Sequence, residues 1–426
     1  MKITHKIEKL QQHLAHVWHA EPIEHSVNAS TRALLKDAGD WDAPVGVEPN
    51  KPTIALAIGI PDSISLPKSA LSAAANRVFN KPGEGAFTYG FGLGYNKLRL
   101  KLAENYSHER GFAVTEDWFQ LCNGSSGAID LICRTLIDPG DVILAESPTY
   151  MGTLRNFKAL NADVESIGMD SDGMFVDQLP RRIETLLQQG RRIKFIYTIS
   201  NFHNPTGATL SLERKIRLLE IAAQYKIIIL DDDAYGALRF DDTPLPTLSG
   251  LSKGHGVITV GTFSKILATG LRIGWIHCHP DLLAAFDKMR FAMGLNQFMV
   301  RVISDYIDSG AMSDHARKVR LIYKTKMNTL ADALETYCAD YLCFTRPLGG
   351  FYIWITLKKG LDAQAVWRTA AEEGVSLTRG TNFFSDRRDD NPHLRLAFSW
   401  TDQGQLIEAA KRLARACERV LQGDAA

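Results

Sequence analysis

One stretch of the sequence decides the fold: Gly261-Thr262-Phe263-Ser264-Lys265-Ile266-Leu267-Ala268-Thr269-Gly270-Leu271-Arg272-Ile273-Gly274-Trp275. A β-branched segment at 257–260 precedes it, and a second apolar segment at 273–276 ends it. This pattern predicts that Lys265 lies on a loop between two buried strands. A single lysine on a loop is usually a solvated charge, so its neighbours decide its interpretation.

Three neighbours of Lys265 indicate a chemical site. Thr262 and Ser264 supply hydroxyls, and Arg272 supplies a guanidinium. Together they can hold a phosphate dianion, to which arginine donates two parallel hydrogen bonds. A lysine beside a phosphate site points to a cofactor that has both a phosphate and a carbonyl. Pyridoxal phosphate fits, because its aldehyde forms a Schiff base with a lysine amine.

The segment resembles the active-site lysine signature of the fold-type-I pyridoxal-phosphate enzymes, specifically the class I/II aminotransferases. That signature has a small hydroxyl residue, any residue, Ser-Lys, a Gly-Leu pair and Arg-x-Gly. The resemblance implies that Lys265 carries the cofactor and that Thr262, Ser264 and Arg272 bind its phosphate. At least six motifs in the family's order extend the resemblance over roughly residues 55 to 420.

Two glycine-rich stretches resemble the family's other phosphate-binding segments. Asn123-Gly124-Ser125-Ser126 follows an expected strand at 119–122 and opens an expected helix, whose free N–H groups attract anions. The resemblance places the phosphate there, with Ser125 and Ser126 as further contacts. The stretch 87–99 contains Tyr89, and the family's tyrosine at this position reaches the phosphate of the neighbouring subunit. This match implies a homodimer with shared active sites, although the residues alone also fit an ordinary surface loop.

Two motifs that follow expected strands resemble the segments that hold the pyridine ring. Tyr150 follows the strand at 142–145, and the family's aromatic residue there stacks on the ring. Asn204 opens Asn-Pro-Thr-Gly after the strand at 195–199, and the resemblance implies that it binds the cofactor's phenolic oxygen together with Tyr235. On the residues alone, the second motif would be a plain Asn-Pro turn.

Three acids end the apolar strand at 227–230. A carboxylate beside the pyridine nitrogen keeps that nitrogen protonated, so the ring can accept electrons. The family places this acid three residues before a tyrosine, which selects Asp232, because Tyr235 follows it. Asp231 and Asp233 are the alternatives, and strand alternation puts both on the face opposite Asp232. We expect Lys265, Asp232 and Tyr150 to be the catalytic residues.

Substrate binding is expected from both ends of the chain. Gly59-Ile60-Pro61 resembles the family's Gly-x-Pro segment, whose glycine backs onto the substrate carboxylate, and Asn204 lies beside the same pocket. Arg395 alternates with apolar residues in an expected strand at 394–398, so it needs an anionic partner. The resemblance makes that partner the substrate α-carboxylate, whereas a structural salt bridge is the alternative. Phe91, Phe202 and Phe351 are expected to form an aromatic pocket wall.

Composition excludes several classes of protein. The chain has 426 residues and a formal net charge of +1, so no broad field attracts nucleic acid or a membrane surface. Its six cysteines form no Cys-x-x-Cys pair, which argues against a zinc site or a disulfide framework, and no metal site is expected. The cysteines fit a reducing compartment. The first residues lack the apolar core of a signal peptide, so we expect a cytoplasmic protein.

Strands alternating with helices, with chemical residues at strand ends, indicate an α/β fold. We expect a large domain (55–305) with a mostly parallel sheet flanked by helices, a smaller α+β domain (306–426), and an N-terminal extension (1–54) that contains an amphipathic helix. The stretch 314–338 is expected to form one long helix between the domains.

The expected activity is transfer of an amino group from an L-amino acid to a 2-oxo acid, such as 2-oxoglutarate or pyruvate. The motifs are most similar to those of the 2-aminoadipate, kynurenine and aromatic aminotransferases. A decarboxylase, lyase or cyclase on the same scaffold is the alternative, and an effector-binding domain without catalysis is a further one.

Overall fold

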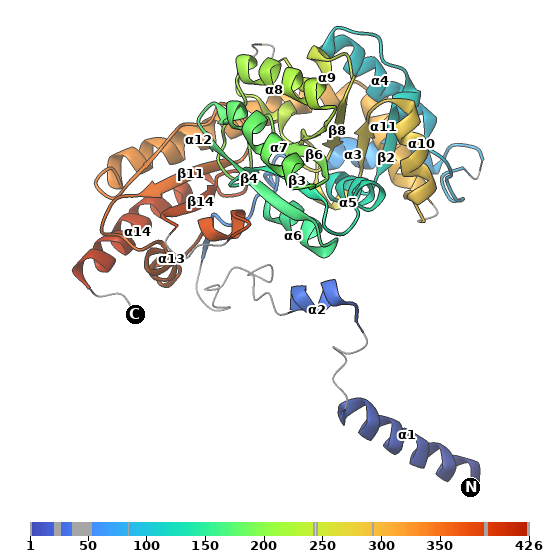
Figure 1. Ribbon diagram of the computed structural model, residues 1–426, viewed down its shortest axis with the longest axis horizontal. Coiled ribbons are helices and arrows are strands. Elements are labelled where there is room, and N and C mark those ends of the chain that lie inside the picture. The colour runs from blue at the N-terminus through green and yellow to red at the C-terminus, as the bar shows by residue number, and fades with distance from the viewer. Residues whose placement is uncertain are drawn as a thin grey trace.

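The computed structural model describes residues 2–20, 27–35, 53–83, 85–241, 243, 246–291, 294–386 and 391–423. Within these ranges the chain builds an eight-stranded sheet, a four-stranded sheet and a two-stranded pair. Helices pack against the two larger sheets, and the elements that follow residue 341 gather at one end of the molecule (Figure 1).

The eight-stranded sheet is mostly parallel, which confirms the predicted fold class. Strands β8, β7, β6, β3 and β4 are parallel, whereas β9 runs antiparallel to β2 and β8, and β5 runs antiparallel to β4. In spatial order the strands are β2 (Phe119–Cys122), β9 (Gly274–His277), β8 (Val257–Thr262), β7 (Ile228–Asp232), β6 (Ile193–Thr198), β3 (Val142–Ser147), β4 (Asp163–Asp170) and β5 (Gly173–Met174).

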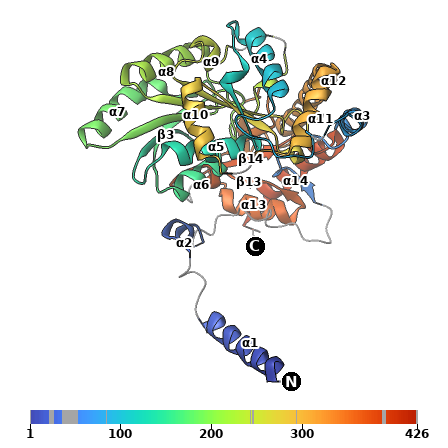
Figure 2. The same ribbon diagram turned by 90° about the vertical axis from the view of Figure 1, so that its right-hand side faces the viewer.

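Both faces of this sheet are buried, because side chains alternate along each strand. Ile143 and Ala145 of β3 pack in one core cluster, with α5 (Gly124–Leu136), α6 (Met151–Ala159) and α10 (Pro280–Met289). Val142 and Leu144 pack in another, with α7 (Leu179–Gln188), α8 (Leu212–Tyr225) and α9 (Leu248–Leu251). Figure 2 shows the two groups of helices on opposite sides of the strands. The sheet is therefore held between two layers of helices, and the ends of its strands are available for catalytic residues.

The four-stranded sheet is antiparallel, in the order β10 (Leu342–Phe344), β11 (Tyr352–Leu357), β14 (His393–Ala397) and β13 (Thr378–Arg379). Helices α13 (Ala363–Glu372) and α14 (Gln403–Gln422) belong to the same region, and their N-cap residues Asp362 and Asp402 accept hydrogen bonds from the first turns. Strand β1 (Ile54–Ala55) pairs with β12 (Val375–Ser376). The segment before the first expected motif thus lies against the C-terminal third of the chain.

The expected long helix is confirmed as α12 (Ala311–Tyr337). It packs on α14, and near its start His315 Nε2 donates a hydrogen bond of 2.9 Å to the carbonyl of Ile266, beside Lys265. Three further helices of this part of the chain are α3 (Lys68–Phe79), α4 (Asn96–Arg110) and α11 (Gln297–Asp308). Short 3₁₀ turns lie at Glu116–Trp118, Val176–Gln178, Gly236–Leu238, Thr269–Leu271 and Gly380–Phe383.

The N-terminal extension contains the expected amphipathic helix as α1 (Lys2–Ala20), which lies away from the rest of the chain in both views (Figures 1 and 2). Its apolar residues Ile7, Leu10 and Leu14 are exposed. Helix α2 (Ala29–Leu35) contacts α6, where Asn161 Nδ2 donates a hydrogen bond of 3.0 Å to Ser30 Oγ. Residues 21–26 and 36–52 of the extension lie outside the described residues. None of the described helices combines the length and apolar character needed to cross a membrane.

Candidate active site

The predicted chemical residues gather at one edge of the eight-stranded sheet. Asp232 is the last residue of β7, Thr262 is the last residue of β8, and Tyr150 follows β3 by three residues. These strands are parallel, so their carboxyl ends meet at the same edge. In open α/β sheets this edge is where ligands bind.

Lys265 lies on the loop between β8 and β9, as predicted. Its Nζ donates a hydrogen bond of 3.0 Å to the carbonyl of Gly59 and lies 5.8 Å from the centroid of the Tyr235 ring. Gly59 itself must be glycine, because an added Cβ would come 2.0 Å from the hydroxyl of Tyr352. The Gly59 segment therefore lies directly against the amine of Lys265.

Asp232 has a buried carboxylate with one free acceptor. Tyr197 donates a hydrogen bond of 3.0 Å to Oδ2, while Oδ1 is buried and has no hydrogen-bond partner among the described residues. Burial raises the pKa of Asp232 to about 7, although the bond from Tyr197 and the charge of Lys265 act in the opposite direction. A protonated pyridine nitrogen would supply the donor that this oxygen lacks. The carboxylate thus fits the expected cofactor.

The two flanking acids bond elsewhere, as alternation predicted. Asp231 accepts a hydrogen bond of 2.7 Å from Ser200 Oγ, and Asp233 accepts one of 2.9 Å from Asn201 Nδ2. Neither of these partners is among the predicted site residues. Asp232 is therefore the acid of the three that matches the pyridine-binding role.

A second cluster matches a phosphate site. Arg272 has the left-handed backbone angle φ of +51° and donates a hydrogen bond of 3.1 Å to the carbonyl of Asn123, just before α5. A Cβ on Gly124 would come 2.9 Å from the Arg272 guanidinium, so the glycine permits this approach. Thr262 Oγ1 and Ser264 Oγ are 2.9 Å apart. The guanidinium thus lies at the positive end of the α5 dipole, a suitable place for an anion.

Ser125 and Ser126 lie in the first turn of α5, directly after Gly124. Their position gives this helix start two hydroxyls beside its free N–H groups. Both residues therefore lie where the sequence placed them, at the same helix end as Arg272.

Tyr150 is half-buried and lies at the same edge of the sheet, after β3. It is the residue before α6, and burial raises its pKa to about 12. The charged groups close enough to affect that pKa are Asp232, Arg272 and Arg395. One side chain is therefore within electrostatic reach of the carboxylate, the proposed phosphate site and the substrate arginine.

Arg395 lies in the middle of β14 and is 4% exposed. Its Nη1 donates a hydrogen bond of 2.9 Å to Asn204 Oδ1, and its Nη2 donates bonds of 2.7 Å to the Ala57 carbonyl and 3.1 Å to Thr378 Oγ1. None of these hydrogen-bond acceptors is a carboxylate. The alternative of a structural salt bridge therefore has no support among the described residues, and a buried guanidinium in neutral surroundings favours an anionic ligand.

Asn204 and Tyr235 extend this part of the site. Because Asn204 Oδ1 accepts from Arg395, its amide nitrogen is the group left to donate to another molecule. The Tyr235 hydroxyl lies 3.0 Å from the Tyr352 hydroxyl, and burial raises the pKa of Tyr235 well above its usual value. Both side chains therefore offer neutral hydrogen-bond donors, one beside Arg395 and one beside Tyr352.

Tyr89 does not join the other predicted residues within one chain. Its side chain is 73% exposed, and its ring contact is with Phe91, at 6.4 Å between centroids. Among the described residues it has no other partner, so its expected role in binding the phosphate stays a prediction.

Two residues that the sequence did not single out are part of the site. Tyr352 contacts Tyr235, would block a Cβ on Gly59, and lies under Arg395, whose guanidinium carbon is 4.3 Å from its ring centroid. Tyr197 bonds Asp232 from the neighbouring strand. The available signal was that both are tyrosines in expected buried strands, and a buried tyrosine hydroxyl needs a partner.

Two of the three residues expected to form the aromatic pocket wall are fully buried. Phe202 and Phe351 are 1% and 0% exposed. The ring of Phe351 packs at 5.6 Å from Tyr235 and at 4.9 Å from Tyr323. Both phenylalanines are core residues, because hydrophobic rings are buried wherever the backbone permits. Phe91 is 69% exposed.

The buried ion pair of Asp62 and Lys326 holds the Gly59 segment in place. Lys326 Nζ of α12 donates a hydrogen bond of 2.7 Å to Asp62 Oδ1 and one of 2.9 Å to the carbonyl of Ser399. Ser399 Oγ in turn donates a bond of 2.7 Å to the carbonyl of Ile60. The backbone that contacts both Lys265 and Arg395 is thus anchored to α12 and to the end of β14.

Together, the mostly parallel sheet, the lysine loop after β8 and the acid at the end of β7 define a fold-type-I pyridoxal-phosphate enzyme. The profile of the family "Aminotransferase class I and II" matches residues 51–413. The chain therefore belongs to the class I and II aminotransferase family, and it is a pyridoxal-phosphate-dependent aminotransferase.

Named relatives extend over most of the chain. Aromatic-amino-acid aminotransferase 1 of Thermococcus litoralis is 33% identical over 95% of this chain and 98% of its own length. The 2-aminoadipate transaminase of Thermus thermophilus is 31% identical over 86% of this chain and 91% of its own length. The crystal structure of Pyrococcus horikoshii kynurenine aminotransferase in complex with PMP matches with a TM-score of 0.82 and 31% identity, over 92% of this chain and 95% of that one. This chain is similar to each of them.

Proposed function

We propose that the residues gathered at the sheet edge divide transamination among them. Bound pyridoxal phosphate supplies a reactive carbonyl and a ring that accepts electrons. Lys265 Nζ holds the cofactor and then, once free, carries a proton away from the substrate Cα. Asp232 Oδ1 accepts the hydrogen bond of the pyridine N–H and keeps that proton in place. Tyr150 packs on the ring and fixes its plane.

Binding of the charged ends is assigned to separate clusters. We place the phosphate between Arg272, the hydroxyls of Thr262 and Ser264, and the first turn of α5 at Ser125 and Ser126. The substrate α-carboxylate would take the two Nη groups of Arg395 in a bidentate contact. Asn204 and Tyr235 would donate to the phenolic oxygen, and Gly59 would leave room for the substrate carboxylate.

The observation that carries this proposal is that one segment, at Ala57 and Gly59, contacts both the lysine and the arginine. Lys265 Nζ donates to the Gly59 carbonyl, and Arg395 Nη2 donates to the Ala57 carbonyl. Asp232 Oδ1 is buried and has no hydrogen-bond partner among the described residues, so it could accept from a molecule held by Lys265.

We infer that the donor is an L-amino acid with a large side chain, of the aromatic, kynurenine or 2-aminoadipate class. The motifs around Lys265 and Asp232 and the names of the similar enzymes support this choice. The acceptor is proposed to be 2-oxoglutarate or pyruvate.

The test is the visible absorption spectrum of the purified holoenzyme while amino acids are added one at a time. We expect donors of the proposed classes to bleach the yellow cofactor band, and a 2-oxo acid to restore it. A band that persists with every donor would favour a decarboxylase, lyase or cyclase. If the band is missing even after addition of pyridoxal phosphate, and Lys265→Ala changes nothing, the assignment of Lys265 is wrong.

We also propose that the enzyme is a homodimer with shared active sites. Phe79, Phe87, Tyr89 and Phe91 are exposed aromatic residues that form two ring pairs, Phe79 with Phe87 and Tyr89 with Phe91, and exposed apolar side chains of this kind are what a subunit interface covers. Analytical ultracentrifugation measures the mass. Mixing Lys265→Ala with Tyr89→Phe subunits tests the sharing, because one site per mixed dimer would then be intact.

A cytoplasmic location is proposed as well. The six cysteines are all free thiols, which suits a reducing compartment. Fractionation of cells that express the tagged chain would test it.

A further inference from the structure

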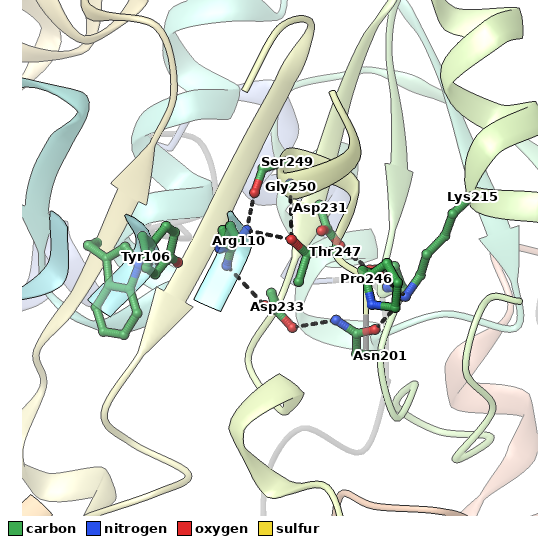
Figure 3. A network of polar contacts seen from close by, with 12 residues as sticks. Tyr106, Arg110, Asn201, Lys215, Asp231, Asp233, Pro246, Thr247, Ser249 and Gly250 are labelled. Atoms are coloured by element: carbon green, nitrogen blue, oxygen red, sulfur yellow. Dashed lines mark hydrogen bonds and ion pairs between the residues drawn. The ribbon is translucent and has the colours of Figure 1, made fainter. Parts of the chain in front are cut away.

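A network of buried charges surrounds Asp231 and Asp233 (Figure 3). Asp231 and Asp233 flank Asp232 on the opposite face of the strand. The Asp231 side chain is fully buried, and the Asp233 side chain is 10% exposed. Burial of carboxylates is costly unless a cation or strong donors compensate it. Asp231 and Asp233 therefore need counter-charges, and the residues assigned to catalysis above do not supply them.

Lys215 of α8 is the first counter-charge. It is 1% exposed, and its Nζ donates hydrogen bonds of 2.9 Å to Asn201 Oδ1 and of 2.9 Å to the carbonyl of Pro246. The other end of the same amide donates 2.9 Å to Asp233 Oδ1. The Asn201 side chain thus bridges the ammonium of Lys215 and the carboxylate of Asp233 (Figure 3).

Arg110, the last residue of α4, is the second counter-charge. Its Nη2 lies 3.5 Å from Asp233 Oδ2, and its Nη1 donates to the hydroxyls of Thr247 and Ser249. The guanidinium carbon lies 3.7 Å from the ring centroid of Tyr106, which covers one face of it. Arg110 is therefore held from three directions with its charge directed at Asp233.

The network also ties together two segments that carry site residues. Asn201 begins the loop after β6 that leads to Asn204, three positions later. Asp233 lies between Asp232 and Tyr235. The hydrogen bond from Asn201 to Asp233 therefore fixes the two strand ends relative to each other.

We propose that Lys215, Asn201, Asp233 and Arg110 form a buried counter-charge network that positions Asp232 and sets the electrostatic potential at the pyridine nitrogen. These four are positioning residues, because none of them would touch the cofactor or the substrate. The inference rests on the role proposed above for Asp232. The inference adds that Arg110 on α4 and Lys215 on α8 balance the charges of Asp231 and Asp233. Asp232 is then the only one of the three acids that acts on the ring.

The direction of each electrostatic effect follows from the charges. Burial raises the pKa of Asp232, the hydrogen bond from Tyr197 lowers it, the charge of Asp233 raises it, and that of Lys265 lowers it. Burial lowers the pKa of Lys215 to about 8, against the attraction of Asp231 and Asp233.

The other charges that face the network are few. Arg239 acts on Lys215 in the same direction as Arg110, and Glu109 lies within electrostatic range of Asp233. Loss of a network cation leaves an excess of negative potential, so protons near the cofactor are held more tightly. Loss of a network acid has the opposite effect.

The experiment compares Lys215→Met, Asp233→Asn and the double variant as full-length holoenzymes. The measured quantity is the pH midpoint of the visible absorbance change of the bound cofactor. A buried charge at this range should shift it by about half a pH unit. We expect the midpoint to rise in Lys215→Met, to fall in Asp233→Asn and to return close to the wild-type value in the double variant.

Two further variants keep the test decisive if Lys215→Met does not fold. Arg110→Gln removes the other cation and should raise the midpoint as well. The matched control is Lys194→Met, because Lys194 lies on β6 but pairs with Asp138 and Asp141 at the other end of the strand. Its midpoint should stay at the wild-type value.

A purely structural role would lower the thermal stability of every variant and would not move the pH midpoint up in the cation variants and down in the acid variant. Opposite shifts of the midpoint would therefore exclude it. If Lys215→Met (or Arg110→Gln) and Asp233→Asn fold, bind the cofactor and keep the wild-type midpoint, the inference is overturned. Asp232→Asn in the same titration separates the two proposals. If its spectrum and midpoint equal those of the wild type, the role assigned to Asp232 fails instead.

Discussion

The two large sheets contribute to the site in different ways. The eight-stranded sheet presents Asp232, Thr262 and Lys265 at or just after the ends of neighbouring parallel strands. The four-stranded sheet presents Arg395 from the middle of β14, and the acceptors around it come from other segments, at Ala57, Asn204 and Thr378. The cofactor side is therefore built on one rigid frame. The substrate side forms only when separate parts of the chain pack together.

This difference predicts how substitutions on each side of the site should impair the enzyme. A change on the cofactor side should remove chemistry and leave the fold intact, because the sheet is clamped by helices on both faces. A change on the substrate side should alter affinity, because the contact depends on the relative positions of segments. The following variants test this contrast, from the largest expected effect to the smallest.

Lys265→Ala should reduce transamination by on the order of 10⁴-fold, because it removes both the attachment point and the group that moves the proton. Single-turnover kinetics with the donor identified by the spectral screen measures the loss. The control is Lys253→Ala, which changes an exposed lysine on the loop before β8. Comparable activity in Lys265→Ala and the wild type would refute the central assignment.

Arg395→Lys should lower kcat/KM roughly 50-fold, since a lysine cannot make the bidentate contact with the α-carboxylate. Most of the loss should fall on KM, and the cofactor spectrum without substrate should be unchanged. Steady-state kinetics with the same donor separates the two parameters, and Arg412→Lys on the surface of α14 is the control. A loss confined to kcat, with KM unaltered, would place Arg395 on the cofactor side.

Gly59→Ala should lower kcat/KM about tenfold, because the new Cβ would overlap the Tyr352 hydroxyl and displace the segment. That segment contacts Lys265 through Gly59 and Arg395 through Ala57, so both sides should respond. Kinetics and cofactor affinity are measured together. The matched control is Gly270→Ala in the lysine loop, where an added Cβ meets open space. Equal effects of the two substitutions would contradict the steric argument.

Asp232→Asn should stabilise the apoprotein by roughly 1–2 kcal/mol above pH 7 and have little effect at pH 4. Burial raises the pKa of Asp232 from its ordinary 3.8 to about 7, so the folded chain holds this proton more tightly than the unfolded chain does. The stabilising contribution is present below pH 3.8 and is lost as the pH rises to about 7. Asparagine does not ionise, so the Asp232→Asn variant does not lose this stability as the pH rises.

Denaturant unfolding of the apoprotein at pH 4, 6 and 8 tests that prediction. Asp340→Asn, at an exposed position, is the control. A variant that is less stable than the wild type at pH 8 would mean that the carboxylate is compensated even without a cofactor.

The positions of the strands, and the acid chosen from three, could be predicted from the sequence. Apolar β-branched runs leave few alternatives for a buried parallel strand, so 142–145, 195–199 and 227–230 indicated β3, β6 and β7 directly. The choice of Asp232 came from the resemblance to the family, through its spacing to Tyr235, and alternation along the strand put Asp231 and Asp233 on the opposite face. The roles of Lys265 and Arg272 came from the resemblance to the family.

Contacts between distant segments could not be predicted in this way. Phe202 and Phe351 were expected at the pocket wall, and the sequence did not indicate that both would be fully buried, because packing decides which face of a loop is buried. Tyr352 and Tyr197 matter only through partners that lie 117 and 35 residues away in sequence. Periodicity contains no information about such pairs.

The sequence by itself determined the class of fold, the lysine loop and the order of the chemical segments, because each depends on residues that are close neighbours in the chain. Tertiary structure alone decided that Lys215 and Arg110 face the acids behind Asp232, and that Ala57, Asn204 and Thr378 surround Arg395. The physical reason is burial. A charge taken out of water must find a counter-charge or a donor in space, and the chain can supply it from any distance along the sequence.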